Sequence, residues 1–317
     1  MSRPTLSKEP GWEPTPDKNF RSGYLALAGR PNVGKSTLLN LLLHQKLSII
    51  TPKPQTTRNT ILGVWQGPEA QIAILDTPGI FTPRKLLQEA MVSSAFRALH
   101  QADLILFITE AGKNNLAEEQ EILEKIFSLS RPVLLALNKI DRLAEKSRLL
   151  PQIEIYSQNF SFQEVFPVSA RTGAGINELL PGLIRSLPPG PPLFPPDYLT
   201  DRPERFFASE IIREAAFSCL QEEIPYSIGV RIEEFRENSR ERGKDYIRAT
   251  ILVGRDTQKA IVLGRQGRKI KEIGEKARKE MEKFLGRPVY LELWVKVQKN
   301  WMENRVWLKE LGYELDN

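Results

Sequence analysis

A glycine-containing stretch early in the chain has residue types that could bind a polyphosphate. Gly29-Arg-Pro-Asn-Val-Gly34-Lys35-Ser36 follows the apolar run Tyr24–Ala28 and precedes a leucine-rich run with helical spacing. Glycines let the backbone turn tightly and bring its N–H groups onto phosphate oxygens, and the N-terminus of the following helix adds partial positive charge. Lys35 can reach the terminal phosphates, and the Ser36 hydroxyl can ligate Mg²⁺. A chance glycine-rich turn is the alternative. The predicted phosphate contacts are Gly29, Asn32, Val33, Gly34, Lys35, Ser36 and Thr37.

Asp76-Thr-Pro-Gly79 is a second candidate, and it directly follows the apolar run Gln71–Leu75. An aspartate at a strand end can hold Mg²⁺ through water, and a glycine N–H there can sense a γ-phosphate. Asp-x-x-Gly alone is a common turn. It indicates a nucleotide site here because it follows a phosphate-binding loop in the chain at a suitable distance. We predict that Asp76 and Ser36 share a magnesium ion and that Gly79 contacts the γ-phosphate.

Asn138-Lys139-Ile-Asp141 indicates which base is bound. The Asp141 carboxylate can accept hydrogen bonds from guanine N1–H and from its exocyclic amine, whereas adenine would leave the carboxylate unpaired. A polar helix N-cap is the alternative. The motif predicts a guanine nucleotide.

A third polar segment, Ser169-Ala170-Arg171, follows the apolar run Val165–Val168. Its backbone could contact the base from the side opposite Asp141. A tripeptide alone has almost no specificity as a motif. We count Ser169-Ala170-Arg171 as part of the nucleotide site only because it follows the other motifs in the expected order.

Composition limits the class of protein. The chain has 317 residues, of which 41% are hydrophobic and 26% charged, as is typical of a globular protein with two cores. The single cysteine, Cys219, excludes an intramolecular disulfide and favours a reducing, cytoplasmic location. The apolar runs are shorter than the roughly 18 residues of a membrane span, and the start lacks a signal-peptide core. The net charge of +6 permits an anionic partner without identifying one.

Short apolar runs alternate with helical patterns in the first part of the chain. Strands are expected at Tyr24–Ala28, Ile61–Trp65, Gln71–Leu75, Leu104–Thr109, Val133–Leu137 and Val165–Val168, and helices near 37–45, 85–100, 117–129, 145–160 and 176–186. This alternation predicts an α/β fold with a doubly wound, mostly parallel sheet and helices on both faces. Ligands of such sheets collect at the carboxyl ends of the strands, where the motifs lie.

Proline-rich segments set the predicted domain boundaries. Residues 1–20 have prolines at positions 4, 10, 14 and 16 and are expected to form a flexible leader. The segment Leu187–Pro196 cannot be a helix or a central strand and is expected to be a semi-rigid, extended linker. We therefore predict a nucleotide-binding domain at 21–187, a linker at 188–197 and a second domain with a tail at 198–317.

The second domain has a different pattern. A helix is expected at Glu204–Gln221, strands at Ile228–Phe235, Tyr246–Val253 and Val289–Val297, and an amphipathic helix after Gly264. The separator 236–244 is expected to be a solvated loop, and a short helical tail is expected to carry two tryptophans.

Gly264-Arg265-Gln266-Gly267 opens the amphipathic helix and has the form of the Gly-x-x-Gly loop of a KH domain. Glycines let a nucleic-acid backbone approach, and the adjoining cations can meet phosphates. Five basic residues and no acidic one lie between Lys259 and Lys271, although charge is nearly balanced over 198–317. A capped surface helix with a solvated basic face is the alternative. The predicted RNA contacts are Gly264, Arg265, Gln266, Gly267, Arg268, Lys269 and Lys271.

The four nucleotide motifs, in this order, resemble those of the translation-factor-like GTPases over residues 20–187. The resemblance implies GTP and GDP as ligands, Mg²⁺ as cofactor, and two switch segments at 51–59 and 79–90. One threonine of the first switch should close over Mg²⁺; Thr57 is favoured, Thr56 is second, and solvent-exposed loop hydroxyls are the alternative. The expected catalytic residues are then Lys35, Thr57 and Gly79, and the expected metal ligands are Ser36, Thr57 and Asp76.

One position departs from the better-known GTPases. Ile80 follows Asp76-Thr-Pro-Gly79, where those proteins place a glutamine that orients water. An apolar side chain cannot polarise water, so slow intrinsic hydrolysis is expected, with acceleration by a partner, an ion or another loop. Related GTPases use an asparagine like Asn32 to bind K⁺, which makes K⁺ a second candidate cofactor; polar packing within the loop is the alternative.

A GTPase domain followed by a KH domain resembles the Era GTPases of bacteria and organelles, and Gln55-Thr-Thr-Arg58 and Leu291–Val297 strengthen the resemblance over about 20–312. It implies a second domain of the α+β, type II KH class. It also implies a monomer that binds small-subunit ribosomal RNA near its 3′ end and assists assembly of the small ribosomal subunit. Peripheral contact with the inner face of the cell membrane is implied as well.

Two other functions remain open at this point. The first is a membrane-recruited signalling GTPase whose second domain binds protein or lipid. The second is a scaffold that binds nucleotide for stability and does not turn over.

Overall fold

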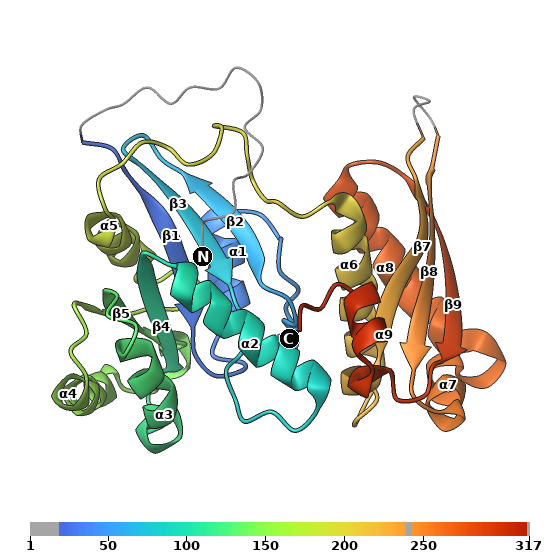
Figure 1. Cartoon of the computed structure of the whole chain (residues 1–317), viewed down its shortest axis with the longest axis horizontal. Helices are drawn as coiled ribbons and strands as arrows, with labels where there is room; N and C mark the ends of the chain where they lie inside the picture. The colour runs from blue at the N-terminus through green and yellow to red at the C-terminus, as the bar shows by residue number, and fades with distance from the viewer. Residues whose placement is uncertain (1–18, 239–242, 316–317) are drawn as a thin grey trace. The chain divides into compact units, whose positions relative to one another are not determined.

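The computed structural model describes residues 19–238 and 243–315, which form two compact units (Figure 1). Of the described residues, unit 1 comprises 19–48, 57–82 and 92–201, and unit 2 comprises 49–56, 83–91, 202–238 and 243–315. The leader expected at 1–20 lies outside the described residues except for its last two positions, and so does the middle of the loop expected at 236–244.

Unit 1 contains a six-stranded sheet in the order β2-β3-β1-β4-β5-β6, in which only the β2–β3 pair is antiparallel. Its strands are β1 Arg21–Ala28, β2 Ile61–Gln66, β3 Ala70–Asp76, β4 Leu104–Glu110, β5 Val133–Asn138 and β6 Val165–Pro167. The predicted doubly wound, mostly parallel sheet is confirmed. Because the chain order reverses between β1 and β4, loops at the carboxyl ends of these strands open a crevice for ligands.

Helices cover both faces of this sheet, and α1 and α2 lie on opposite sides of it in Figure 1. They are α1 Lys35–Leu43, α2 Leu86–Gln101, α3 Leu116–Phe127, α4 Leu149–Asn159 and α5 Ile176–Ser186, with short 3₁₀ turns at Ile140–Arg142 and Lys146–Arg148. Alternate residues of β1 point to opposite faces. Ala26 and Ala28 join the core cluster of α2 and α3, while Leu25 and Leu27 are buried outside that cluster.

Two boundaries differ from the sequence expectation by three residues or more. β1 begins at Arg21 and not at Tyr24, because residues 21–23 pair with residues 70–72 of β3 although they are polar or small. The helix expected from 145 begins at Leu149, and its first turn is the separate 3₁₀ turn.

The proline-rich segment lies within unit 1 and is held to its sheet. Gln71 accepts hydrogen bonds from the backbone N–H groups of Leu193 and Phe194 at 2.6 and 2.9 Å and donates to the Phe194 carbonyl at 2.8 Å. The Ser22 hydroxyl donates to the Pro191 carbonyl at 2.6 Å, and the Phe194 ring is buried and stacks on Tyr198. An extended proline-rich backbone has no internal hydrogen bonds. The Gln71 and Ser22 side chains therefore supply hydrogen-bond partners for the backbone groups of residues 191, 193 and 194.

Unit 2 has a three-stranded sheet in the order β7-β8-β9, antiparallel between β7 and β8 and parallel between β8 and β9. Its elements are α6 Glu204–Cys219, β7 Gly229–Arg236, β8 Asp245–Val253, α7 Asp256–Leu263, α8 Arg268–Leu285, β9 Val289–Val297 and α9 Arg305–Glu310, with 3₁₀ turns at Pro225–Ser227, Arg265–Gly267 and Trp301–Glu303. One apolar cluster joins α6, α7 and α8 to the sheet, and this arrangement confirms the predicted α+β domain.

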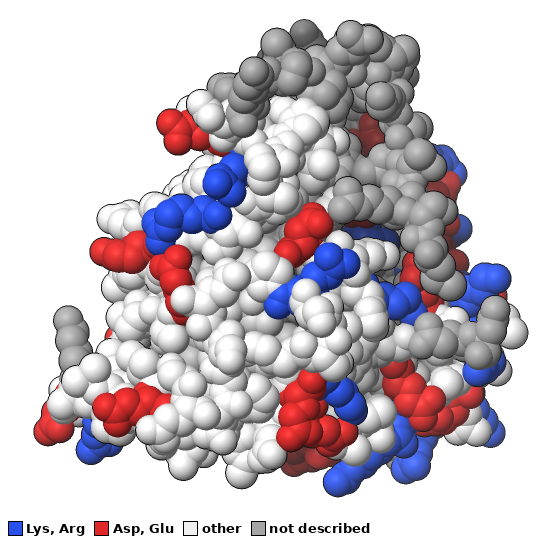
Figure 2. Space-filling view, turned by 60° about the vertical axis from the view of Figure 1, so that its left-hand side comes forward, with Lys and Arg blue, Asp and Glu red and all other residues white. Residues whose placement is uncertain are grey.

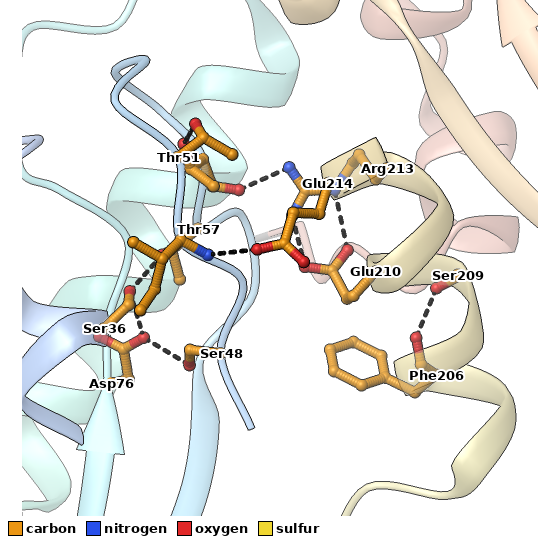
Figure 3. Close-up of polar contacts among 12 residues, drawn as sticks. Ser36, Ser48, Thr51, Thr57, Asp76, Phe206, Ser209, Glu210, Arg213 and Glu214 are labelled. Atoms are coloured by element: carbon orange, nitrogen blue, oxygen red, sulfur yellow. Dashed lines mark hydrogen bonds and ion pairs between the residues drawn. The ribbon is translucent and has the colours of Figure 1, made fainter. Parts of the chain in front are cut away.

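A buried ion pair lies on α6 inside unit 2. The Arg213 guanidinium binds both carboxylate oxygens of Glu210 (Figure 3). Its remaining nitrogen, Nη1, donates to the Thr56 carbonyl at 2.5 Å. Within the same unit, Lys53 Nζ donates to the Phe217 carbonyl at 2.6 Å. Part of the expected first switch segment therefore packs with α6 as one unit.

In the described ranges, 19–238 and 243–315, we find no helix with the length and apolarity needed to cross a membrane.

Candidate functional site

The loop from Gly29 to Ser36 connects β1 to α1 in unit 1, as the motif requires. Gly34 has φ of +106°, and a Cβ at this position would overlap the side-chain nitrogen of Asn138, so only glycine fits. Lys35 is 5% exposed, and its ammonium donates to the Gly29 and Arg30 carbonyls at 3.0 and 2.9 Å. Burial lowers the Lys35 pKa from its ordinary value of 10.5 to about 8, although the nearby Asp76 charge opposes this shift. An incoming phosphate would favour the charged form of this lysine.

Three predicted metal ligands converge at the first turn of α1. The Ser36 hydroxyl donates to Asp76 Oδ2 at 2.7 Å and lies 2.7 Å from the Thr57 hydroxyl (Figure 3). Because Ser36 has one hydroxyl hydrogen, which goes to Asp76, Thr57 must be the donor in the second contact. The fold thus brings together side chains that are up to 40 positions apart in the chain.

The Asp76 carboxylate fits a role at a magnesium site. It is fully buried at the end of β3, and its Oδ1 has no hydrogen-bond partner among the described residues. Burial raises its pKa, while the Ser36 and Ser48 hydroxyls and the Lys35 charge act in the opposite direction. A buried carboxylate oxygen needs a donor, and water bound to a divalent cation is a strong one. Hydroxyl and carboxylate oxygens are also the ligands that Mg²⁺ prefers.

The two candidate switch threonines have different surroundings. The Thr56 hydroxyl is buried and lies 2.6 Å from the Thr51 hydroxyl and 2.7 Å from the Lys53 carbonyl. The Thr57 hydroxyl is next to Ser36 instead. Of the two, only Thr57 has its hydroxyl in contact with the cluster of Ser36 and Asp76 among the described residues.

The second motif contacts the phosphate-binding loop closely. The Ile80 N–H donates to the Gly29 carbonyl at 3.1 Å, and a Cβ on Gly79 would lie 2.6 Å from the Pro31 nitrogen. Gly79 therefore has to be small for the two loops to approach. The Ile80 side chain is 4% exposed and packs in the core with α2 and α3, so it cannot orient a water molecule.

Asn138 ties the loops of the base site together. It is buried at the end of β5; its Nδ2 donates to the Val33 carbonyl at 2.7 Å, and its Oδ1 accepts from the Ala170 N–H at 2.9 Å. The Ala170 N–H, which belongs to the segment whose backbone is expected to contact the base, thus already has an acceptor. The Asn138 side chain therefore joins the phosphate-binding loop to the segment 169–171 by hydrogen bonds to their backbones.

The Asp141 carboxylate is prepared to accept hydrogen bonds. The Ser169 hydroxyl donates to its Oδ1 and Arg171 Nη2 donates to its Oδ2, both at 2.6 Å. The Ser169 hydrogen bond, together with the Arg171 charge, holds the pKa of Asp141 below its usual range although desolvation opposes it. The side chain is therefore ionised at neutral pH. A base that binds this carboxylate would share or replace its contact with the exposed Arg171 side chain.

The remaining predicted contacts lie in segments that follow the carboxyl ends of β1 and β5. Lys139 has φ of +69°, and its ammonium donates to Glu110 at the end of β4 at 3.0 Å. Asn32 is exposed at the tip of the phosphate-binding loop with φ of +64°, and Thr37 follows Ser36 in α1.

In unit 2, the Gly-x-x-Gly loop forms the tight connection from α7 to α8. Gly264 and Gly267 have φ of +68° and +75°, and Gln266 between them has φ of +51°. A Cβ on Gly264 would lie 2.6 Å from the Lys269 Cβ, so this glycine is required for the connection itself. Substitution of either glycine would strain the loop as well as alter any ligand contact.

The basic residues around this loop do not all present a free charge. The side chains of Arg265, Arg268 and Lys271 are exposed, whereas the Lys269 ammonium donates to Glu272 one turn later at 2.8 Å. Charge is mixed elsewhere too: the face drawn in Figure 2 shows basic and acidic side chains interspersed among the described residues. The backbone geometry of the loop 264–267 therefore distinguishes it from the rest of the surface more than its net charge does.

Sequence reasoning missed several residues of these sites. Ser48 donates to Asp76 Oδ2 at 2.7 Å, and Asn40 of α1 binds the Ser48 backbone, yet neither belongs to a motif. Sequence reasoning also missed an exposed apolar side chain: Ile261 of α7, three residues before Gly264, is 49% exposed. An apolar residue in a helical pattern predicts burial, so no local signal separates it from the core residues beside it.

Comparisons with known proteins match both units. Residues 24–139 match the family model for a 50S ribosome-binding GTPase, and residues 223–302 match the model for a KH domain. GTPase Era of Geobacter metallireducens is 47% identical over 297 residues, which cover 94% of this chain and 99% of that protein. GTPase Era of Lacticaseibacillus paracasei is 45% identical, with 92% and 96% covered.

Two solved structures have the same fold over most of the chain. One is Aquifex aeolicus Era, as a variant bound to GDP·AlF₄⁻, and the other is Era in complex with MgGDPNP and nucleotides 1506–1542 of 16S ribosomal RNA. Each is 44% identical with a TM-score of 0.90, and the match covers 93% of this chain and all of the other.

Proposed function

This chain belongs to the Era family of GTPases, and we propose that it is a GTP-operated, magnesium-dependent switch that binds small-subunit ribosomal RNA near its 3′ end. As a member of the family it is an enzyme, a hydrolase that acts on GTP. The role we propose for it is to assist assembly of the small ribosomal subunit.

The observation that carries the proposal is the convergence of three oxygen groups at the start of α1. Ser36, Thr57 and Asp76 lie within hydrogen-bond distance of one another, next to the buried Lys35. Bound Mg²⁺ would neutralise charge on the nucleotide phosphates. Ser36 and Thr57 would hold the ion directly, and Asp76 would hold one of its waters. Thr57 belongs to the first switch, so its position depends on whether the triphosphate is bound.

Hydrolysis should be slow without help. Ile80 is buried in the core and supplies no polar atom to the attacking water. We infer that an activating group comes from a partner, an ion or another loop. For a potassium ion the candidate is Asn32, at the exposed tip of the loop. Equal rates of GTP hydrolysis in matched Na⁺ and K⁺ buffers would remove potassium from the proposal.

The link from nucleotide to RNA goes through the first switch. Within unit 2, Lys53 and the Thr56 carbonyl bind α6, the helix that packs against α8. Thr56 is the neighbour of Thr57, whose hydroxyl reaches Ser36. A nucleotide that changes the position of Thr57 therefore acts on a segment that is also part of the RNA-binding unit.

RNA binding is proposed for the loop 264–267 and the start of α8. Exposed Arg265, Arg268 and Lys271 can meet phosphates, and glycines let the backbone approach. The description of the GTPase model names the large subunit, but the RNA in the Era complex is 16S, the small-subunit RNA. This supports the small subunit as the target of this chain.

The test is a pair of measurements on the full chain. Phosphate release should continue over multiple turnovers with GTP and Mg²⁺ and be absent with ATP, and RNA crosslinks should map to 264–271. Binding of GTP with single-turnover kinetics only would support a nucleotide-stabilised scaffold instead.

The rival function is a membrane-recruited signalling GTPase, in which unit 2 binds lipid or protein. It predicts that the chain co-sediments with anionic vesicles and yields no crosslink to RNA in the segment 264–271. The family resemblance also implies peripheral membrane contact alongside RNA binding, and vesicle binding that leaves RNA crosslinks intact would support both.

A further inference from the structure

We propose that Ser48, which no nucleotide motif includes, is a positioning residue for the magnesium site and acts through Asp76. Its hydroxyl holds one carboxylate oxygen of Asp76, which keeps the other oxygen available to a metal-bound water. The inference rests on the magnesium site of the proposed function.

The Asp76 carboxylate has an asymmetric environment. Oδ2 accepts the hydroxyls of Ser36 and Ser48, each at 2.7 Å, whereas Oδ1 is buried with no partner in the described part of the chain. Two donors on one oxygen fix the plane of the carboxylate group, because any partial rotation about its C–C bond would break both hydrogen bonds. The arrangement in Figure 3 therefore leaves one defined oxygen for the metal side.

Ser48 is itself held rigidly, which a positioning residue requires. It is 1% exposed; its N–H donates to Asn40 Oδ1 at 2.9 Å, and its carbonyl accepts from Asn40 Nδ2 at 2.7 Å. Asn40 also accepts from the Leu47 N–H at 2.9 Å. This two-ended clamp fixes the backbone of Ser48 relative to α1.

The clamp connects Ser48 to the phosphate-binding loop. Ser36 and Asn40 are four residues apart on α1, so they lie on the same side of the helix. Helix α1 therefore positions both hydroxyls that donate to Asp76. Ser36 lies on the helix itself, and Ser48 is held to it by Asn40. A shift of Ser48 without a shift of α1 would break the clamp.

Ser48 has a task that Ser36 cannot perform alone. The Ser36 hydroxyl is shared between Asp76 and Thr57, and it is the expected direct ligand of the metal. The Ser48 hydroxyl donates to Asp76 in the described structure and is not a predicted ligand. It can therefore hold Asp76 in the same orientation whether or not the metal and Thr57 are in place.

A purely structural role for Ser48 makes a different prediction. Ser22 offers a matched control: it is also a buried serine of unit 1, but its hydroxyl donates to the Pro191 carbonyl, away from the phosphate-binding loop. Loss of either hydroxyl removes one hydrogen bond of a buried serine, fully buried for Ser48 and partly buried for Ser22. Only loss of the Ser48 hydroxyl should change how the protein responds to Mg²⁺.

The experiment measures release of a fluorescent GDP analogue from the full chain as the Mg²⁺ concentration is varied. Mg²⁺ is expected to slow release, and the Mg²⁺ concentration at half of this effect should rise about tenfold in Ser48→Ala. Loss of a residue that hydrogen-bonds to a metal ligand weakens metal binding by about 10- to 100-fold, and tenfold is the low end of that range. Release in EDTA should match the wild type. Ser48→Cys, with a weak donor, should give an intermediate shift, and Ser22→Ala should show no shift.

The outcomes separate this inference from the proposed function. If release from the wild type responds to Mg²⁺ but the Ser48→Ala midpoint stays within about twofold of it, the inference is wrong and the magnesium site stands. An equal shift in Ser22→Ala, or equally faster release in EDTA, would also overturn the inference. A wild type whose release ignores Mg²⁺ would contradict the magnesium site and the inference together.

Discussion

The two glycine-containing loops of this chain place their functional groups in opposite environments. The loop 29–36 surrounds a buried lysine and lies against a fully buried aspartate, Asp76. The loop 264–267 presents exposed Arg265 and is followed by other exposed cations. Charges in a buried network interact strongly and cannot be replaced by water, whereas exposed charges are screened and act additively. Single substitutions should therefore abolish function at the first loop and reduce it in steps at the second.

The largest effect is expected for Lys35→Ala. Loss of a buried, charge-assisted contact to phosphate should lower GTP affinity by at least about a hundredfold, since about 1.4 kcal/mol corresponds to a factor of ten. Equilibrium binding of a fluorescent GTP analogue measures this. Lys125→Ala, which removes a lysine paired with Glu121 on the surface of α3, should leave affinity unchanged. Tight GTP binding by the Lys35 variant would show that the site is assigned wrongly.

The second loop is best tested without touching its glycines, because Gly264 and Gly267 are needed for the turn. Arg265→Asp combined with Gln266→Asp should weaken RNA binding about 10- to 100-fold, and removal of each cation–phosphate interaction should reduce the salt dependence by about 0.7–0.9 in slope. Gln266 has positive φ, which aspartate tolerates. Filter binding at several salt concentrations gives both quantities.

The control for this variant is Lys279→Asp, an exposed change on α8 about three turns from the loop. GTP hydrolysis without RNA should be unchanged in both variants. RNA affinity that falls equally in the two would mean that net charge, and not the loop, governs binding.

A smaller, graded effect is expected from pH at the first loop. The Lys35 pKa is lowered to about 8 in the nucleotide-free protein, and bound phosphates favour its charged form. Below pH 8 Lys35 is already protonated in the free protein, so nucleotide affinity should be constant there. Above pH 8 the free protein has lost this proton, and nucleotide binding has to take it up again. Above that pH, affinity should fall as pH rises, by at most about tenfold per pH unit.

The measurement is GDP affinity between about pH 7 and 8.5, chosen around this pKa and below the range in which guanine itself ionises. Lys35→Arg, which keeps its charge, should remove the dependence. A wild-type affinity that is flat across this range would contradict the assigned pKa.

The smallest effect is expected for Arg171→Ala. Arg171 pairs with Asp141 across an exposed surface, and such pairs contribute about 0–1 kcal/mol. Its removal should change GDP affinity by less than about fivefold. Ser169→Ala should have the larger effect, because it removes the buried donor to Asp141. Calorimetry on both variants would rank them, and the reverse order would contradict the assignment of Ser169 as the main partner.

Much of the fold follows from local sequence patterns. Strands of the parallel sheet are buried on both faces, so they appear as continuous apolar runs such as residues 104–108. The motifs directly follow these runs, which places them at one edge of the sheet. The loop 264–267 is equally predictable, since its glycines are fixed by backbone geometry.

Other features depend on contacts between distant residues and could not be predicted. The proline-rich composition indicates an extended chain, but not that Gln71 binds it or that Phe194 is buried. Charged residues in a helix suggest solvent, yet Glu210 and Arg213 are a buried pair. Ser48 reaches Asp76 across 28 positions, which no local pattern reveals.

The most direct test of the central claim is the RNA affinity of the full chain in its two nucleotide states. The RNA is a fragment equivalent to nucleotides 1506–1542 of 16S ribosomal RNA, measured at fixed salt with Mg²⁺ and either GDPNP or GDP. If the first switch couples nucleotide to the RNA-binding unit, the GDPNP form should bind about 5- to 150-fold more tightly, the usual range of such coupling. Equal affinity in the two states would contradict a GTP-operated RNA switch.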